Sequence, residues 1–349
     1  MHSFDRLKIR SKIHYIWSNQ DYIMADKIRW GIVGPGRIAH SFAKDLSLVE
    51  GGKLTAVASR NLQRAQEFAN EYGAEYSFGS YEELFDSDVV DVLYIATPHT
   101  SHCELSIAAM EKGKNVLCEK PMGLNSHEVG QMVDSAKKNN VFLMEALWSR
   151  FNPSILKVKE IVEKGTLGEI AYLNANFGFY ALDRDEEHRL LNPNLAGGSL
   201  LDIGIYPIFL AYLILGKPET IKAMSKFHST GVEAQTAMIF DYPFAQAVLT
   251  SGLRSKISMK AEIAGSKGSA YLQERWHETQ GYSFELNGEE QAVDLPTKGI
   301  GYSHEIEEVH RCLQEGKLQS DKWSLQNSLD LVGLLDEVRK ITGVTFPNE

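Results

Sequence analysis

The sequence predicts an α/β fold in which a doubly wound parallel sheet is followed by an α+β domain with a largely antiparallel, open sheet. Three observations lead to this prediction. From Lys27 to residue 147, short apolar segments alternate with segments of helical periodicity. A glycine-rich turn follows the first of these apolar segments. Beyond Trp148 the alternation stops, and most segments have strand character.

The chain is long and apolar enough to form two folded domains. It has 349 residues, 43% of them hydrophobic, and a formal net charge of −10. The negative charge argues against nucleic acid or an anionic membrane as a partner. No unbroken apolar run approaches the roughly 20 residues of a membrane span. We therefore expect neither nucleic acid nor membrane as a partner.

The cysteines and the N-terminus both indicate a cytoplasmic protein. Cys103, Cys118 and Cys312 are far apart and show no CxxC spacing, so a zinc site and a disulfide scaffold are poor interpretations. Residues 1–26 lack the apolar core and cleavage site of a signal peptide. Because Met24 lies just before the first strand, we expect these residues to be a disordered or non-native extension.

Residues 27–147 are expected to form the first domain, which holds the parallel sheet. Gly73 would end its second helix, and Asn125 or Ser126 would cap its fourth. The expected strands are 28–34, 53–59, 91–97, 114–120 and 141–147, and the expected helices are 37–46, 61–73, 101–113 and 125–139.

Residues 148–349 are expected to form the second domain, which would bind the substrate and a second subunit. A helix at 154–164 opens it, and two helices at 303–316 and 325–341 close it. Short turns with Gly, Pro or Asp join several of its strands, which indicates antiparallel pairing. These strands are expected at 169–180, 220–229, 232–242, 245–253, 259–272 and 283–289.

The turn after the first strand has the chemistry of a dinucleotide site. Its sequence GPGRIA (34–39) has the G-x-G-x-x-A pattern. The glycines let the backbone turn tightly and approach a pyrophosphate, and the following helix offers free amides to it. This pattern predicts a Rossmann domain that binds a dinucleotide through Gly34, Gly36, Arg37 and Ile38.

The end of the second strand favours NADP over NAD. NAD sites usually place an acidic residue here for the ribose 2′-hydroxyl. This strand ends instead in Ser59 and Arg60, with Arg64 one turn later. A guanidinium matches a 2′-phosphate, so Ser59 and Arg60 are candidate cofactor ligands. The alternative for Arg60 is a solvated surface arginine.

Two further strand ends carry polar residues at the edge where open parallel sheets bind ligands. At the first, Thr97, Pro98 and His99 are candidate cofactor ligands; His99 could equally be a loop histidine bonded to backbone. At the second, the proline of the Glu-Lys-Pro tripeptide stops the strand and holds Lys120 at its end. From the tripeptide alone, a lysine that simply extends into water is an equal alternative.

Four segments together resemble one family. They are the G-x-G-x-x-A turn, the Glu-Lys-Pro tripeptide, MEALWSRFNP (144–153) and GGSLLDIGIYP (197–207). In this order they resemble the glucose–fructose oxidoreductase / inositol dehydrogenase (Gfo/Idh/MocA) family. Within that family the last two segments are similar to the dihydrodiol dehydrogenases, which also act as NADP-dependent D-xylose dehydrogenases. The resemblance extends over the chain from Lys27 onward.

The resemblance implies catalytic roles for three residues. Lys120 matches the lysine that hydrogen-bonds the reacting oxygen, and Asp202 matches the acid that faces it from the second domain. Tyr206 stands where many sugar dehydrogenases of the family have histidine, so an Asp–His pair is not expected. Asp202 and Tyr206 are four residues apart and would share one face of a helix.

The resemblance also implies further cofactor contacts. Glu119 matches the residue that helps to hold the nicotinamide ribose, and Lys120, beside the expected nicotinamide, is a candidate cofactor contact as well as a catalytic residue. Trp148 and Arg150 match the W-x-R-F segment that lines the nicotinamide end. His99 matches a position near the same half of the cofactor.

These residues predict an enzyme that transfers hydride between NADP and a sugar or cyclic diol, with Lys120 moving the hydroxyl proton. Two alternatives are a non-catalytic redox sensor and a reductase of an enone or imine. No metal ligand pattern is present. The open second sheet is expected to form a homodimer or homotetramer, as in relatives.

Overall fold

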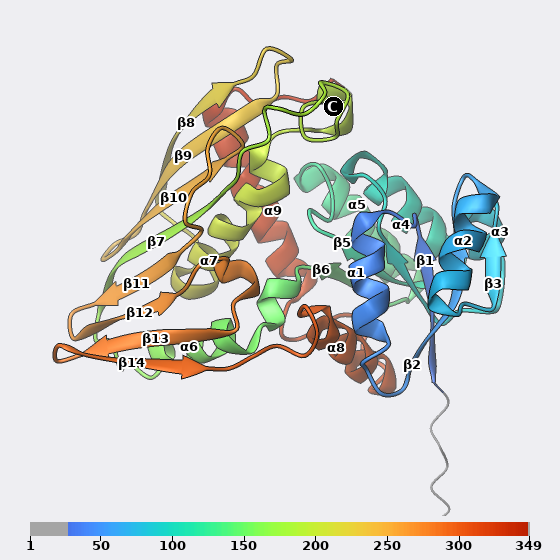
Figure 1. The fold of residues 1–349 in the computed structure, drawn as a ribbon, viewed down its shortest axis with the longest axis horizontal. Coiled ribbons are helices and arrows are strands. Elements are labelled where there is room, and N and C mark those ends of the chain that lie inside the picture. Colours follow the sequence, from blue (N-terminus) through green and yellow to red (C-terminus); the bar gives the residue numbers. More distant parts are fainter. Residues whose placement is uncertain (1–26, 348–349) are drawn as a thin grey trace, which may run out of the picture.

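The computed structural model describes residues 27–347, which form two sheets with their helices (Figure 1). The predicted extension at 1–26 lies outside the described residues. The expected fold class is confirmed: one sheet is parallel and the other is largely antiparallel.

The first sheet has six parallel strands in the order β3-β2-β1-β4-β5-β6. Because β1 lies between β2 and β4, the winding reverses at this point. The carboxyl ends of β1 and β4 therefore form the crevice in which such sheets bind ligands. The strands are β1 (Ile28–Val33), β2 (Gly52–Ala58), β3 (Tyr76–Phe78), β4 (Val92–Ile95), β5 (Asn115–Glu119) and β6 (Leu143–Ala146).

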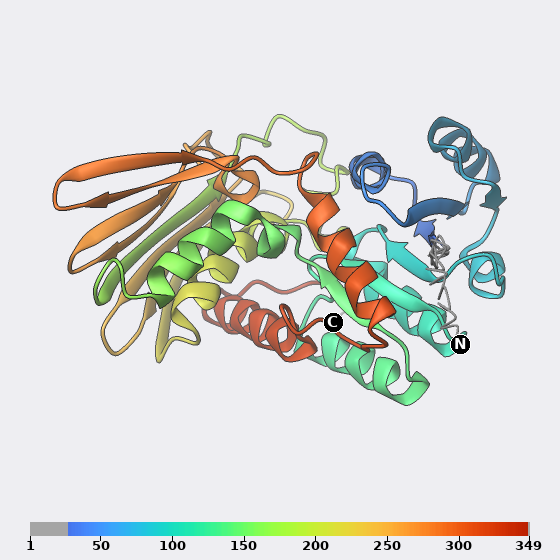
Figure 2. The same cartoon turned by 90° about the horizontal axis from the view of Figure 1, so that it is seen from below.

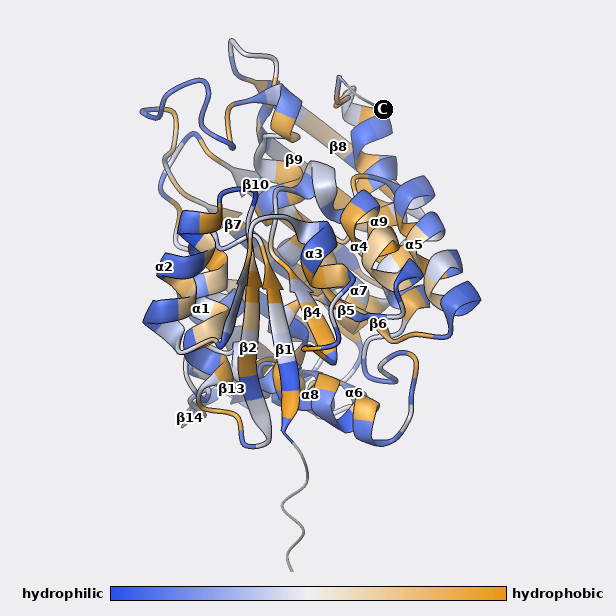
Figure 3. Cartoon of the chain, turned by 90° about the vertical axis from the view of Figure 1, so that its right-hand side faces the viewer, coloured by the Kyte–Doolittle hydropathy of each residue, from blue (hydrophilic) through white to orange (hydrophobic). Residues whose placement is uncertain are grey.

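Helices cover both faces of this sheet, as the view from below shows (Figure 2). Alternate residues of β1 point to opposite faces: Trp30 and Ile32 join one buried cluster, and Val33 joins the other. Figure 3 shows hydrophilic residues on the outer surface of α5, whereas the strands are mostly hydrophobic. The helices are α1 (Arg37–Leu46), α2 (Leu62–Tyr72), α3 (Tyr81–Phe85), α4 (His102–Glu111) and α5 (Ser126–Asn139).

The predicted helix ends are largely as expected. Gly73 ends α2 in the left-handed conformation, with φ of 72°. The side chain of Asn125 caps α5 by accepting from the Glu128 N–H at 3.0 Å. Ser126 is not the cap, because it is already helical, and its hydroxyl instead donates to Asp336 at 2.6 Å.

The second sheet has eight strands in the order β14-β13-β12-β11-β7-β10-β9-β8. Only β7 and β10 pair in parallel. Helices α6 (Pro153–Glu163), α7 (Ile205–Leu215) and α9 (Leu325–Thr342) lie along one face, and the other face carries no helix (Figures 1 and 2). The strands are β7 (Ile170–Gly178), β8 (Thr220–Phe227), β9 (Glu233–Asp241), β10 (Gln246–Gly252), β11 (Ala261–Gly265), β12 (Gly268–Leu272), β13 (Gly281–Leu286) and β14 (Glu289–Asp294).

The central helix of the second domain is strongly apolar. It begins with a π-helical turn, Leu200–Gly204, and continues as α7. The segment Pro193–Leu215 is long and apolar enough to cross a membrane, a feature that a search for unbroken apolar runs misses. Its most apolar stretch is 78% buried inside the protein, so this segment forms the core of the second domain.

The last two helices return to the first domain. The carboxylate of Asp45 in α1 accepts backbone N–H groups at the start of α8 (Tyr302–Gln314), including that of Tyr302 at 2.8 Å. The indole of Trp30 in β1 donates to Nε2 of His310 in α8 at 2.9 Å. Together with the α9 contact to Ser126, these bonds fasten the two domains to each other.

Several elements differ from the prediction. The short strand β3 and the helix α3 were not predicted. The strand expected at 259–272 is a hairpin, β11 and β12, that turns at Ser266 and Lys267. The strand expected at 283–289 is β13, and the unpredicted β14 pairs with it as the edge of the sheet.

Candidate active site

The glycine turn after β1 leaves the N-terminus of α1 open. Gly34 has φ of +88°, and a Cβ there would lie 2.9 Å from Cγ2 of Thr97. Gly36 is the N-cap of α1, and no side chain caps it. The first amides of α1 are therefore available to a phosphate, and the positive end of the helix dipole favours one.

The end of β2 presents two arginines to solvent. Arg60 and Arg64 are exposed, and within residues 27–347 neither forms an ion pair with an acidic side chain. Ser59 is buried, and its hydroxyl accepts from the Asn61 N–H at 3.2 Å. Residues 59–64, which follow β2, include no acidic residue. The three residues lie outside the cavities described next.

A cavity of about 440 Å³ lies between the two domains. One wall comes from the first domain and contains the glycine turn and the ends of β4 and β5. The other wall comes from the loop before α7 and from the π-helical turn. The predicted ligands along it are Gly36, Arg37, Ile38, Thr97, Pro98, His99, Glu119, Lys120 and Asp202.

Lys120 and Asp202 meet across this cavity. The Lys120 ammonium donates to the main-chain oxygen of Asp202 at 2.7 Å and lies 3.5 Å from its carboxylate. Arg189 binds both carboxylate oxygens of Asp202, at 3.0 and 3.3 Å. Burial alone would raise the pKa of Asp202, but the charges of Lys120 and Arg189 outweigh it and hold that pKa below its usual range. Asp202 is therefore a carboxylate.

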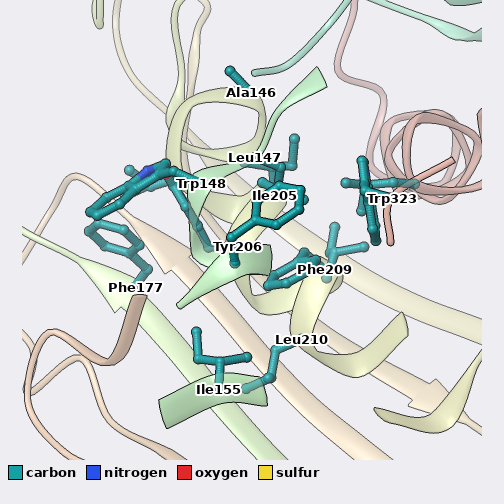
Figure 4. Close-up of a cluster of buried hydrophobic side chains, with 14 of the residues drawn as sticks. Ala146, Leu147, Trp148, Ile155, Phe177, Ile205, Tyr206, Phe209, Leu210 and Trp323 are labelled. Atoms are coloured by element: carbon teal, nitrogen blue, oxygen red, sulfur yellow. The ribbon is translucent and has the colours of Figure 1, made fainter. Parts of the chain in front are cut away.

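Tyr206 lies beside Lys120 in an adjoining cavity of about 390 Å³. The Lys120 ammonium is 5.2 Å from the centre of the Tyr206 ring. The indole of Trp148 donates to the Tyr206 hydroxyl at 2.8 Å. Figure 4 shows Trp148, Phe177 and Tyr206 together in this buried cluster. The second cavity thus combines aromatic walls with the polar groups of Lys120 and Asp202.

Glu119 is buried next to Lys120. Its carboxylate accepts a hydrogen bond from the hydroxyl of Tyr94. Burial raises the pKa of Glu119 to about 7, although the Lys120 charge and the Tyr94 hydrogen bond act against it. Glu119 can therefore gain or lose a proton near neutral pH.

Two histidines follow β4. Burial and the neighbouring His102 lower the pKa of His99 well below its usual range, and Nδ1 of His99 has no partner among the described residues. The two ring nitrogens of His102 lie 2.8 Å from the Pro121 carbonyl oxygen and 2.9 Å from that of Thr97. His102 thus joins the two strand ends that flank the cavity, while His99 has a nitrogen free for a ligand.

Arg150 does not join the other predicted cofactor residues. It is buried, its guanidinium lies 5.8 Å from the centre of the Phe151 ring, and it lines neither cavity. Trp148 lines the second cavity instead of the first. The W-x-R-F segment therefore contributes its tryptophan, and not its arginine, to the surroundings of Lys120.

Two relatives identify the family of this chain. Trans-1,2-dihydrobenzene-1,2-diol dehydrogenase from Mus musculus is 38% identical over 335 residues, which cover 92% of this chain and 99% of the mouse chain. The Homo sapiens enzyme of the same name is 36% identical over 336 residues, with the same coverage. Residues 28–147 match the model of an oxidoreductase family with an NAD-binding Rossmann fold, and residues 155–271 match the GFO/IDH/MocA C-terminal domain. The chain belongs to the Gfo/Idh/MocA oxidoreductase family.

Solved structures of this family share the fold. KijD10, a 3-ketoreductase from Actinomadura kijaniata in complex with TDP-benzene and NADP, is 25% identical, with a TM-score of 0.82. The comparison covers 91% of this chain and 98% of KijD10. Aldose-aldose oxidoreductase from Caulobacter crescentus has a TM-score of 0.84 at 23% identity, which shows the fold alone.

The open helix terminus, the unpartnered Nδ1 of His99 and the unpartnered Oγ1 of Thr97 fit the NAD(P) that a Gfo/Idh/MocA Rossmann domain implies. They border one cavity, which Lys120 also lines. A pyrophosphate would lie at the amides of α1, and the nicotinamide half would lie towards Lys120.

Sequence reasoning missed three residues of this Gfo/Idh/MocA site. Arg184 and Arg189, from the loop before α7, line both cavities, and the buried His277 lines the second. Burial lowers the pKa of His277 to about 3, so it is a neutral imidazole in the pocket wall. Nothing in the spacing of these residues indicates a site, because the fold alone brings them to Lys120.

Proposed function

We propose that this protein is an NADP-dependent dehydrogenase that transfers hydride between NADP(H) and the carbinol or carbonyl group of a cyclic diol or sugar. One observation carries the proposal. Lys120 of the Rossmann domain and Asp202 of the second domain meet in a cavity that begins at the dinucleotide turn. In this assignment residues 27–147 bind the cofactor, and residues 148–349 complete the substrate site.

The end of β2 supports NADP as the cofactor. Two exposed arginines, Arg60 and Arg64, stand there without acidic partners among the described residues, and no carboxylate is present to bind a ribose 2′-hydroxyl. A guanidinium forms charge-assisted hydrogen bonds to a 2′-phosphate. The relative KijD10 is a complex with NADP.

The walls of the second cavity support a cyclic diol or pyranose as the substrate. Trp148, Phe177 and Tyr206 give it apolar faces against which a ring can pack, and Lys120 and Asp202 give it polar groups for hydroxyls. The relatives named above act, by their names, on trans-1,2-dihydrobenzene-1,2-diol. A dihydrodiol is therefore the first substrate to test, and D-xylose is the second.

Each side chain has a role in the proposed reaction. The cofactor accepts hydride from the carbinol carbon when bound. In its neutral form the Lys120 side chain takes the hydroxyl proton as the carbonyl forms, and as an ammonium it returns that proton in the reverse direction. The main-chain oxygen of Asp202 fixes the Lys120 nitrogen, and Arg189 holds the Asp202 carboxylate. Tyr206, oriented by Trp148, can donate to the reacting oxygen.

A substrate panel tests the proposal. The purified protein is incubated with NADP or NAD and with trans-dihydrodiols, D-xylose, other pyranoses and cyclic enones, and absorbance at 340 nm is recorded. We expect oxidation of a dihydrodiol or pyranose with NADP. NADPH binding without turnover of any compound would favour a redox sensor, and NADPH oxidation by enones alone would favour the reductase alternative.

We also propose that the helix-free face of the second sheet forms a homodimer or a homotetramer in the cytoplasm. Met224 on β8, Ile239 on β9 and Tyr172 on β7 are exposed on this sheet, Met224 by 74%. Exposed apolar side chains on a bare sheet face are typical of a subunit interface. Light scattering of the wild type and of Ile239→Glu tests it: we expect the substitution to reduce the assembly size.

A further inference from the structure

We propose that Glu233 is a positioning residue that holds the segment 199–206, here called the catalytic turn, in its working place. The inference rests on the proposed function, because Glu233 would act through Asp202 and Tyr206 of that turn. Glu233 is the first residue of β9 and lines neither cavity. Its action on the reaction is therefore indirect.

The Glu233 carboxylate accepts four hydrogen bonds, three from the start of the catalytic turn and one from Thr236 on β9. Oε2 accepts from the backbone N–H groups of Ser199 at 2.9 Å and Leu200 at 2.8 Å. Oε1 accepts from the hydroxyls of Ser199 at 2.7 Å and Thr236 at 2.8 Å. Ser199 is the N-cap of the helix, but its own side chain makes no capping bond. The Glu233 carboxylate, from β9, therefore caps this helix in place of the Ser199 side chain.

The burial of Glu233 makes this cap unusual. Glu233 is 1% exposed, and within residues 27–347 no basic side chain forms an ion pair with it. A buried carboxylate without a countercharge is costly, and burial raises the pKa of Glu233 although its hydrogen bonds from Ser199, Thr236 and Leu200 act against that rise. A neutral side chain could fill the same space without this cost. The carboxylate therefore fixes the turn and does not merely fill the core.

Two glycines of the segment GGSLLDIGIYP (197–207) allow the close contact between the catalytic turn and the strands that carry Glu233 and Ser251. Gly198 has φ of +124°, and a Cβ there would lie 3.0 Å from the main-chain oxygen of Glu233. A Cβ on Gly204 would lie 2.9 Å from Oγ of Ser251, which is itself 2.8 Å from Oγ of Ser199. Both glycines let the turn press against β9 and β10. The segment 197–207 thus supplies the glycines that let the catalytic turn attach to the sheet, as well as the proposed catalytic residues Asp202 and Tyr206.

The attachment leads directly to the reacting groups. Two residues after Leu200, the main-chain oxygen of Asp202 accepts the Lys120 hydrogen bond. A turn released at its start would shift both Asp202 and Lys120. A misplacement of about 1 Å in an active site can cost about 100-fold in rate.

Kinetics of Glu233→Ala and Glu233→Gln test the proposal, with Glu308→Gln as the matched control at another buried glutamate. We expect Glu233→Ala to lower kcat about 100-fold, with KM and the Kd of NADPH within about threefold of wild type. Glu233→Gln should lose less than about tenfold, because the hydroxyls of Ser199 and Thr236 can reverse and accept from the amide. Glu308→Gln should reduce stability and leave kcat unchanged, because Glu308 binds Arg311 and Lys322 on α8 and beyond it.

A double-mutant cycle separates positioning from general damage. If Glu233 acts by placing Lys120 through Asp202, then Lys120→Ala combined with Glu233→Ala loses no more activity than Lys120→Ala alone. If the activity losses of the two single variants multiply in the double variant, the proposal is overturned. A Glu233→Ala enzyme with kcat within threefold of wild type would overturn it as well. If Glu233→Ala does not fold, Glu233→Asp, which withdraws the carboxylate by one methylene group, takes its place with the same expectations.

Hydrogen exchange gives a readout that needs no turnover. Peptides that contain residues 198–206 should exchange faster in Glu233→Ala than in wild type, and equally in Glu308→Gln and wild type. Unchanged exchange in Glu233→Ala overturns the proposal whatever the activity. Faster exchange in a protein that oxidises no diol or sugar would support the attachment while the proposed function fails.

Discussion

The side-chain nitrogen of Lys120 donates to the main-chain oxygen of Asp202, while Arg189 binds the Asp202 carboxylate with the two terminal nitrogens of its guanidinium. Lys120 comes from the first sheet, and Asp202 comes from the central helix of the second domain. Asp202 thus binds Lys120 through its main-chain oxygen and Arg189 through its carboxylate. This arrangement leaves the carboxylate ionised and fixes the Lys120 nitrogen through a group that cannot titrate.

Replacement of Lys120 by alanine tests its role in proton transfer. We expect Lys120→Ala to lower kcat by about 100-fold to 10,000-fold, because a positioned acid–base group contributes about that factor. The Kd of NADPH, measured by fluorescence, should stay close to that of wild type. Lys112→Ala removes a lysine paired with Asp86 on the surface and should leave kcat unchanged. A Lys120→Ala enzyme with near-wild-type kcat would refute the role.

Replacement of Arg60 by aspartate tests the cofactor preference. We expect Arg60→Asp to lower the ratio of kcat/KM for NADP to that for NAD by about 10-fold to 100-fold, because it replaces the proposed ligand of the 2′-phosphate with a repelling charge. Lys267→Asp makes the same charge change on an exposed turn of the second domain and serves as the control. An unchanged ratio in Arg60→Asp would contradict the assignment.

The buried Glu119 predicts a pH-dependent stability. Its folded-state pKa is raised from 4.5 to about 7, so the folded protein binds this proton more tightly than the unfolded chain. The corresponding stability, on the order of 3 kcal/mol, is complete below about pH 4.5 and is lost as pH rises through about 7. We therefore expect the Tm of the protein to fall less between pH 5 and pH 8 in Glu119→Gln than in wild type.

Calorimetry without cofactor measures this effect. Glu262→Gln, on β11, is the control and should keep the wild-type dependence of Tm on pH. Equal pH dependence in Glu119→Gln and wild type would mean that Glu119 does not hold its proton in the folded state.

The bond between Trp148 and Tyr206 should contribute to catalysis. Trp148→Phe keeps an aromatic ring against Tyr302 but removes the donor to the Tyr206 hydroxyl. We expect kcat to fall about 10-fold, because Tyr206 loses the bond that orients it. In a double-mutant cycle with Tyr206→Phe, the two losses should not multiply. Fully additive effects would show that Trp148 acts by another route.

Asp45 should be important for stability and not for chemistry. Its buried carboxylate accepts backbone N–H groups of residues 300–303, from Ile300 to Ser303. We expect Asp45→Ala to reduce the free energy of unfolding by about 3 kcal/mol, because it leaves these amides buried without partners. Denaturant unfolding measures the loss, and Asp86→Ala, an exposed acid, should show little. A loss below 1 kcal/mol would contradict this role.

The fold was predictable wherever a segment showed strong periodicity. The alternating strands and helices of 27–147 were found in order, because each buries one face or both. The strand β3 has only three residues, none of them buried, so it shows no pattern. The edge strand β14 is acidic and mostly exposed, and its pairing with β13 comes from the hairpin at Asn287 and Gly288.

The candidate site was predictable where a motif carries it. Lys120, Asp202 and Tyr206 stand in recognisable segments, and the structure brings them together. Arg189 stands in no motif, and its bond to Asp202 depends on how the loop before α7 folds back. Arg150 shows the opposite case, because its motif predicts a cofactor contact and its side chain is buried beside Phe151.

The hydrogen bond from Trp30 to His310 joins residues 280 positions apart, which the ribosome makes at well-separated times. The cluster that covers one face of the first sheet also contains Tyr302 and Ile306 of α8. A nascent chain that has emerged only as far as β6 thus contains all six strands of the first sheet but lacks the α8 side chains that help to cover one of its faces. The nucleotide-binding half can complete its folding only after the ribosome has made α8 of the second domain.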